Sequence, residues 1–140
     1  MSISNQQKLL IRHRAANCCE YCRLGEGGRL ARFHIDHIIA IKHDGTDTDD
    51  NLCLACPKCN AHKGENIAAA DPETAKATFL FHPRRQVWKE HFSINADATI
   101  SGLTPEGRAT VAVLRINDDK RVKQRYGDMA VGDYPCKKDE

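Results

Sequence analysis

Cys19-Glu20-Tyr21-Cys22 and Cys56-Pro57-Lys58-Cys59 each place two cysteines three positions apart, and 33 residues separate the two stretches. A tight turn aims both sulfurs of such a pair in one direction. Two pairs therefore supply the four thiolates of a closed, tetrahedral zinc site. A bound structural ion contributes folding free energy directly. The spacing predicts a structural zinc site that joins two segments distant in the sequence.

The remaining cysteines leave the choice of ligands partly open. Cys18 is the direct neighbour of the first pair, and Cys53 stands three positions before Cys56, which is also the spacing of a pair. Pairing Cys56 with Cys59 is preferred because the residues between them supply a turn. Cys53 lies between two leucines, where a small apolar side chain is expected to pack. Cys136, near the C-terminus, is interpreted as a bystander.

Composition limits the class of protein. The chain has 140 residues, of which 41% are hydrophobic and 6% aromatic, so it holds one domain with a thin core. No apolar run approaches the roughly 20 residues that cross a bilayer. The start, residues 1–5, lacks the basic and apolar stretches of a signal peptide. We expect a cytoplasmic protein without a membrane partner, in which clustered cysteines bind metal rather than form disulfides.

The formal net charge of +2 conceals a segregation of charge. Residues 8–32 and 83–126 each carry +4, whereas residues 33–78 carry −4. Two basic segments beside an acidic one fit a polyanion-binding face around a metal-binding centre. Solvated helix faces explain the same charge runs.

Local patterns predict helices and strands in mixed order. Helices are expected where capping residues precede helical periodicity, at residues 4–17, 60–67, 71–80, 84–92, 104–116 and 117–126. Strands are expected where β-branched residues cluster, at residues 33–41, bent into a hairpin, and in a second hairpin of residues 92–94 and 98–100. The chain is divided into a core of residues 1–70, an extension of residues 71–127 packed on it, and a frayed tail of residues 128–140.

A second set of polar residues accompanies the cysteine pairs. Asp36 and His37 lie on the expected strand, Asn51 follows the acidic loop, and Asn60 and Lys63 follow the second pair. Over about residues 15–66 the sequence resembles the HNH endonuclease family. The resemblance rests on a cysteine pair, then Asp-His, then Asn-Leu, and a second cysteine pair that is followed by Asn-x-x-Lys. The third residue of the family name is often His and is Asn60 here, an HNN variant.

The resemblance implies a fold and a set of roles. The fold is α+β: a zinc-stapled ββα-metal core with flanking helices and a small C-terminal hairpin plus helices. His37 is the general base that activates water, and Asp36 and Asn60 hold the catalytic metal against the leaving 3′ oxygen. Asn51 keeps the hairpin that carries His37 in register, and Lys63 contacts phosphate. The products carry 5′-phosphate and 3′-hydroxyl ends.

The chemistry of these residue types supports the same roles. Phosphodiester hydrolysis needs a base that works near neutral pH, and histidine has an unperturbed pKa of about 6.5. The carboxylate of Asp36 and the amide of Asn60 offer the oxygen ligands that Mg²⁺ or Mn²⁺ prefers. A sulfur-rich shell selects zinc, so two different metals coexist in one small domain.

Basic residues in the expected extension are candidates for DNA contacts. Phosphate contacts from such residues give sequence-independent affinity. The candidates lie on expected helices or at their ends and are Arg84, Arg85, Lys89, Arg108, Arg115, Arg121, Lys123 and Arg125. Trp88 is expected to anchor packing rather than stack on bases. DNA is the expected partner, and RNA is not excluded.

Two other interpretations stay open. A non-catalytic zinc module that binds nucleic acid or protein explains the cysteine pairs and basic segments, but not the joint occurrence of Asp36, His37, Asn51 and Asn60. A thiol redox protein would use one cysteine pair, and it would need a reactive pair of low pKa rather than zinc-bound sulfurs.

Overall fold

The structure is a computed structural model that describes residues 3–27 and 29–138. Residues 1–2 and 139–140, on which parts of the leader and tail expectations rest, lie outside the described residues. The elements in chain order are α1 (Asn5–Arg14), β1 (His34–His37), η1 (Ile41–His43), η2 (Asp49–Asn51), β2 (Leu52–Ala55), α2 (Pro57–Lys63), β3 (Ala68–Ala70), β4 (Ala77–Phe79), α3 (Trp88–His91), β5 (Phe92–Ile94), β6 (Ile100–Gly102), α4 (Pro105–Val113) and α5 (Asp119–Ala130). The fold is α+β, as expected. Across the described residues, no helix has the length and apolar character needed to cross a membrane.

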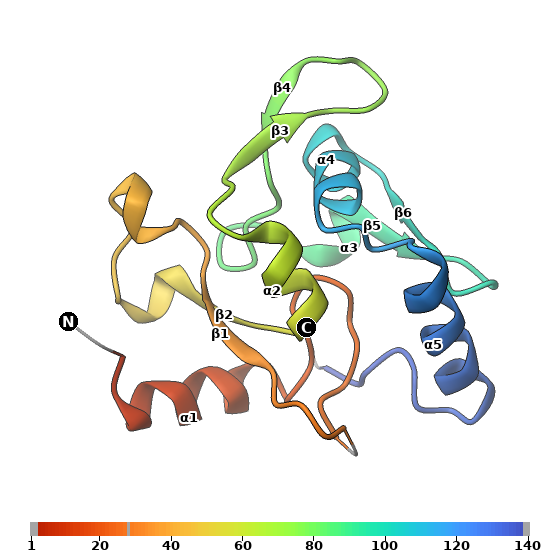
Figure 1. Ribbon diagram of the computed structural model, residues 1–140, viewed down its shortest axis with the longest axis horizontal. Coiled ribbons are helices and arrows are strands. Elements are labelled where there is room, and N and C mark those ends of the chain that lie inside the picture. Colours follow the sequence, from red (N-terminus) through yellow and green to blue (C-terminus); the bar gives the residue numbers. More distant parts are fainter. Residues whose placement is uncertain (1–2, 28, 139–140) are drawn as a thin grey trace.

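A ββα unit occupies the centre of the molecule (Figure 1). Strands β1 and β2 pair antiparallel, from His34 opposite Ala55 to His37 opposite Leu52. All of β2 is buried. Helix α2 starts immediately afterwards because Cys56 caps it and Pro57 occupies its first turn, where a missing N–H costs nothing. The helix expected over residues 60–67 therefore begins and ends earlier in the chain.

Helix α1 braces the connection between β1 and β2. Ser4 and Gln7 form a reciprocal capping box at its start, which confirms one of the expected caps. The Gln7 side chain also donates to the backbone oxygen of Asp47 at 2.8 Å. Farther along the helix, Arg14 donates to the backbone oxygen of Leu52 at 2.6 Å. The N-terminal helix thus contacts the connection at Asp47 and the start of β2 at Leu52.

The expected helix over residues 71–80 is wrong, because these residues form the turn and the second strand of the β3–β4 hairpin. Ala68 pairs with Phe79 in this hairpin. Asp71 accepts a hydrogen bond from the backbone N–H of Glu73 at 3.0 Å and one from the Thr74 hydroxyl at 3.0 Å. An aspartate that caps a helix forms this Asx turn with the same carboxylate. The sequence Asp71-Pro72-Glu73 is therefore compatible with a turn as well as with the start of a helix.

The rest of the extension follows the expected order with shorter elements. Helix α3 covers only the end of the segment predicted over residues 84–92. Strands β5 and β6 confirm the second hairpin, displaced by two residues at its second strand. Gly102 is required there because a Cβ atom would lie 2.4 Å from the backbone nitrogen of Arg108. Thr104 caps α4 as expected.

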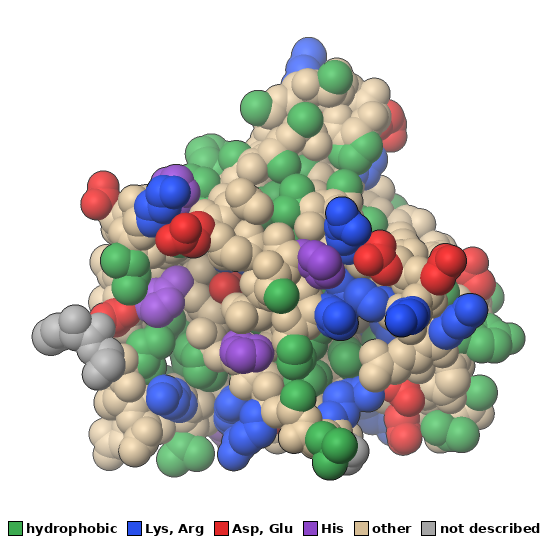
Figure 2. All heavy atoms as spheres, viewed as in Figure 1, with side chains coloured by type: hydrophobic (Ala, Val, Ile, Leu, Met, Phe, Trp, Pro, Cys, Tyr) green, Lys and Arg blue, Asp and Glu red, His purple; other side chains and the backbone are tan. Residues whose placement is uncertain are grey.

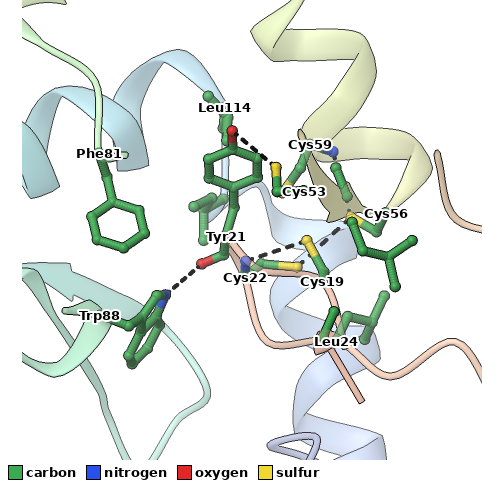
Figure 3. Close-up of a cluster of buried hydrophobic side chains, with 14 of the residues drawn as sticks. Cys19, Tyr21, Cys22, Leu24, Cys53, Cys56, Cys59, Phe81, Trp88 and Leu114 are labelled. Atoms are coloured by element: carbon green, nitrogen blue, oxygen red, sulfur yellow. Dashed lines mark hydrogen bonds between the residues drawn. The ribbon is translucent and has the colours of Figure 1, made fainter. Parts of the chain in front are cut away.

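One apolar core joins the extension to the ββα unit (Figure 3). Trp88 is buried, and its indole N–H donates to the backbone oxygen of Tyr21 at 2.9 Å. The Phe92 ring lies 5.0 Å from the Trp88 ring and 5.1 Å from the Phe81 ring, between centroids. The expectation that Trp88 anchors packing is confirmed.

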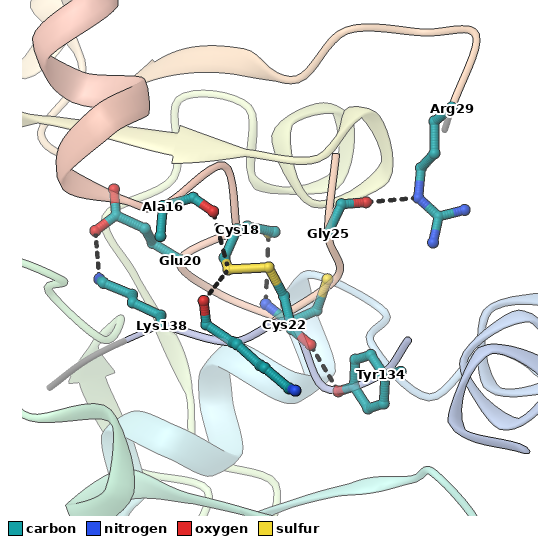
Figure 4. Close-up of a disulfide and its surroundings, with 11 residues drawn as sticks. Ala16, Cys18, Glu20, Cys22, Gly25, Arg29, Tyr134 and Lys138 are labelled. Atoms are coloured by element: carbon teal, nitrogen blue, oxygen red, sulfur yellow. Dashed lines mark hydrogen bonds and ion pairs between the residues drawn. A yellow bond between two sulfur atoms is a disulfide. The ribbon is translucent and has the colours of Figure 1, made fainter. Parts of the chain in front are cut away.

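The C-terminal segment is packed rather than frayed over its described residues. Helix α5 continues through Gly127 to Ala130. Tyr134 is buried, and its hydroxyl donates to the backbone oxygen of Cys22 at 2.7 Å. Cys136 forms a disulfide with Cys18 (Figure 4). Cys136 is therefore no bystander, and the expectation that the cysteines avoid disulfides fails for this pair. The buried tyrosine explains why the segment stays on the core, since burying an aromatic side chain offsets the ordering of a short tail.

Candidate metal centre and catalytic site

Four sulfurs converge at the centre of the molecule. The Sγ atoms of Cys19, Cys22, Cys56 and Cys59 all lie within 4.8 Å of one another, and all four residues are buried. Within each pair the second cysteine's backbone N–H points at the first sulfur, at 3.5 Å and 3.4 Å. Both pairs are thus turns that present two sulfurs to a common point, and Figure 3 shows the four side chains pointing toward one another.

This donor set fits zinc. Four thiolates at about 2.3 Å from one ion form the closed tetrahedral shell of a structural site. Cys53 lies outside the group and packs against the Tyr21 hydroxyl, with its sulfur 3.5 Å away. The cluster thus consists of the four cysteines of the two pairs, and Cys53 is not part of it. Among the described residues, no other group of three or more His, Cys, Asp or Glu side chains has this arrangement.

Arg121, which was expected to contact DNA, instead contacts the cysteine cluster. Its guanidinium is buried and donates to the Cys59 sulfur at 2.9 Å, to the Cys56 sulfur at 3.7 Å and to the backbone oxygen of Leu114 at 2.6 Å. Burial lowers the pKa of Arg121, but the nearby sulfurs, Cys59 first among them, raise it above its usual value. A zinc ion held by four thiolates would carry a net charge of −2, which Arg121 would partly offset. No motif links a residue so far along the chain to the cysteine pairs.

Asp36 lies on the face of β1 that α2 covers. It is 5% exposed, and its Oδ2 atom accepts a hydrogen bond from the Tyr21 hydroxyl at 3.0 Å. The same oxygen lies 3.2 Å from the Lys63 ammonium and 3.6 Å from the Cys53 sulfur. Burial raises the pKa of Asp36, whereas the Lys63 charge acts to lower it.

Lys63 is buried beside Asp36 and does not face solvent. The residue is 1% exposed, and its ammonium donates to the backbone oxygen of His37 at 2.9 Å. The position follows from α2, because Lys63 comes four residues after Cys59 and shares its inward face. The structure therefore does not place Lys63 where the expected phosphate contact needs it.

His37 occupies the more open side of the strand. Its side chain is 24% exposed, and its Nε2 atom lies 2.7 Å from Oδ1 of Asp47. Successive residues of a strand point to opposite faces, so His37 is directed away from the enclosed carboxylate of Asp36. The imidazole is thus accessible while its neighbour is not.

Asn51 ties the connection between β1 and β2 to the end of β1. Its side-chain oxygen accepts from the backbone N–H of Ile39 at 2.9 Å, and its amide nitrogen donates to the backbone oxygens of Ile39 at 2.9 Å and Thr46 at 2.8 Å. These three bonds have the geometry of a residue that keeps the hairpin in register. Asn51 therefore lies where the family resemblance implies.

Asn60 is half-buried on α2, one residue after the zinc ligand Cys59 and three before Lys63. Residues three apart are neighbours on a helix surface, so Asn60 is a neighbour of Lys63 on α2. Lys63 in turn faces Asp36. Helix α2 packs against both β1 and β2. The structure thus gathers Asp36, His37 and Asn60 onto one ββα unit.

The basic residues divide into two groups. Arg84 pairs with the buried carboxylate of Glu20, Arg108 with Asp71 at 2.8 Å, and Arg125 donates to backbone oxygens inside the molecule. The exposed candidates are Arg85, Lys89, Arg115 and Lys123. Figure 2 shows Lys and Arg side chains gathered between α2 and α5, with Asp and Glu among them. Four of the candidates stabilise the fold, because each donates to a protein acceptor: Arg84, Arg108, Arg121 and Arg125.

Comparison with known proteins agrees with this architecture. Residues 19–66 match the model of the HNH endonuclease family. The match covers about a third of the chain. The matched segment contains the four clustered cysteines together with Asp36, His37, Asn51, Asn60 and Lys63, whereas the extension lies outside the match. Searches of curated proteins and of solved structures gave no significant match.

Proposed function

We propose that this protein is a metal-dependent endonuclease that hydrolyses DNA phosphodiester bonds, with His37 as its general base. The observation that carries the proposal is the accessible imidazole of His37 at the end of β1, within a ββα unit of the HNH family. A neutral imidazole within hydrogen-bond reach of a water accepts its proton as the oxygen attacks phosphorus. The products are expected to be 5′-phosphate and 3′-hydroxyl ends.

The residues that would hold a catalytic divalent ion are Asp36 and Asn60. Both offer oxygen ligands, the type that Mg²⁺ and Mn²⁺ prefer. When bound, such an ion stabilises negative charge on the phosphoryl and leaving oxygens. The Lys63 ammonium lies 3.2 Å from the Asp36 carboxylate, so Asp36 would have to share its charge between Lys63 and a divalent ion, or Lys63 would have to move away. The structural zinc site is separate and needs no such exchange.

DNA is the proposed substrate because exposed Lys and Arg side chains remain on the extension. We expect exposed residues among them, such as Arg85, Arg115 and Lys123, to contact phosphate without reading base sequence. Affinity is therefore expected to fall with salt concentration.

One observation favours the alternative of a non-catalytic zinc module that binds nucleic acid. The Asp36 carboxylate is 5% exposed and already has hydroxyl and ammonium partners. If those contacts persist when nucleic acid binds, the site lacks a metal and the protein is a binding module.

A plasmid assay separates the two functions. Zinc-loaded protein is incubated with supercoiled plasmid and Mg²⁺ or Mn²⁺, beside His37→Ala and the matched control His34→Ala, which alters an exposed histidine of the same strand. We expect nicking or linearisation by the wild type and the control, and a loss of about 10²-fold or more in His37→Ala. Intact plasmid with the wild type in both metals, despite DNA binding in a gel-shift assay, would establish the non-catalytic module. Cleavage retained in His37→Ala would remove the assigned base.

A further inference from the structure

Asp47 is a carboxylate that neither the motif nor the family roles account for. It lies in the connection between β1 and β2, and its Oδ1 atom is 2.7 Å from Nε2 of His37. Both side chains are 24% exposed, so the contact is partly shielded from water. Within the described part of the chain, this is the hydrogen bond that the His37 ring forms, and it leaves the Nδ1 atom without a protein partner there.

The chemistry of the pair decides which nitrogen of His37 carries the proton. An ionised carboxylate only accepts hydrogen bonds, so a neutral imidazole in this geometry donates from Nε2. Its Nδ1 atom then has a free lone pair. The contact therefore fixes both the tautomer and the orientation of the ring.

Asp47 is itself held from two directions. Gln7 of α1 donates to its backbone oxygen at 2.8 Å, and Asn51 donates to the backbone oxygen of the preceding residue, Thr46, at 2.8 Å. Gly45 lets the loop come this close to β1, because a Cβ atom there would lie 1.7 Å from the backbone oxygen of Ile39. A carboxylate on a backbone that is held in this way is well suited to orient a partner.

We propose that Asp47 is the positioning residue of His37, an inference that rests on the proposed nuclease function. Asp47 keeps the proton on Nε2 and leaves Nδ1 to accept a proton from water. The water oxygen then forms the new bond to phosphorus, and the P–O bond to the leaving 3′ oxygen breaks with its electron pair on that oxygen. The resulting imidazolium keeps its Nε2–H directed at the Asp47 carboxylate, which stabilises the positive charge. Asp47 touches no reacting atom.

The test compares Asp47→Asn with Asp44→Asn. Both substitutions remove one acidic charge from the same loop, but Asp44 is exposed and Asp47 is the carboxylate that contacts His37. Proton NMR of ¹⁵N-labelled, zinc-loaded protein without substrate should show the His37 Nε2–H resonance far downfield. We expect it to move upfield or exchange away in Asp47→Asn, because a charge-assisted hydrogen bond is lost. It should stay unchanged in Asp44→Asn.

The kinetic arm measures plasmid cleavage with the same variants. In Asp47→Asn we expect kcat to fall by about 10²-fold or more, as for other histidine bases that lose an orienting carboxylate, with KM for DNA within about twofold. Asp44→Asn should cleave like the wild type. An unchanged Nε2–H resonance in Asp47→Asn, or a change in KM alone, would overturn the positioning role. A changed resonance in a protein that never cleaves would instead overturn the nuclease function and leave the coupling of the two residues supported.

Discussion

The HNH segment, residues 19–66, and the extension that follows it place their charged groups for different purposes. The HNH segment concentrates them into a site, with four sulfurs within 4.8 Å and Asp47 at 2.7 Å from His37. The extension turns much of its charge inward, since Arg121 donates to the Cys59 sulfur and Arg84 pairs with the buried Glu20. Basic residues of the extension therefore support the site electrostatically. A basic stretch of sequence is not by itself evidence of a DNA-binding surface.

The largest expected effect is the loss of the zinc site, which would collapse both regions together. Chelation, or Cys59→Ser, removes a contribution of about 10 kcal/mol or more, which is comparable to the whole stability of a small domain. We expect the loss of the cooperative unfolding transition in circular dichroism. Metal analysis should find about one zinc per chain in the wild type.

Cys53→Ser is the control for this prediction. The residue is buried but lies outside the group of four sulfurs. It should therefore keep its zinc. Zinc loss of equal extent in Cys53→Ser and Cys59→Ser would contradict the ligand assignment.

An intermediate effect is expected where the extension meets the zinc site. Arg121→Met removes the guanidinium that donates to the Cys59 sulfur and to the backbone oxygen of Leu114. The free energy of unfolding should fall by about 3 kcal/mol, because buried acceptors lose a charged donor. Zinc transfer to a competing chelator should also become faster.

Lys123→Met is the matched variant on the same helix, because Lys123 is exposed. We expect its stability and its rate of zinc transfer to resemble those of the wild type. If Arg121→Met and Lys123→Met transferred zinc at the same rate, the extension would have no electrostatic role at the metal centre.

The smallest effect is expected within the extension itself, at the turn of the β3–β4 hairpin. Arg108 donates to both oxygens of Asp71, at 2.9 Å and 2.8 Å, and this holds the pKa of Asp71 well below its usual range. The pKa in the unfolded chain is about 3.9. The pair therefore contributes stability above about pH 4, which is lost as pH falls toward the lower folded-state pKa.

Urea unfolding of the wild type and Asp71→Asn at several pH values checks this sign. The difference in free energy of unfolding should be larger at pH 6 than at pH 3. Arg108→Gln should reduce the same pH dependence, because the charged partner is gone. A difference that did not vary with pH would refute the contribution of the pair.

The features predicted correctly depend on residues close in sequence. The cysteine pairs are turns of four residues, and the caps formed by Ser4 and Thr104 act within one helical turn. The β5–β6 hairpin is also local. For such features the sequence contains both partners of each interaction within a short window, so residue chemistry is enough.

The features missed depend on where the chain folds back. Nothing near Arg121 in the sequence indicates a thiolate, and a long basic side chain on a helix resembles a solvent-exposed one. The contact between Asp47 and His37 requires the bend of the β1–β2 connection, which Gly45 and Asn51 create together. The Asp71 turn shows the remaining difficulty, because one carboxylate satisfies either a helix start or an Asx turn.

Helix α2 has only seven residues, yet it includes Cys59 and the proposed metal ligand Asn60. Each step along an α-helix turns the side-chain direction by about 100°. An ion bound by Cys56 and Cys59 would therefore fix the rotation of this short helix about its axis. The same rotation determines the directions of the Asn60 and Lys63 side chains. A bound zinc would therefore fix the directions of these side chains. The insertion of a single residue between Cys59 and Asn60 would turn Asn60 and Lys63 away from Asp36 even in a fully folded protein.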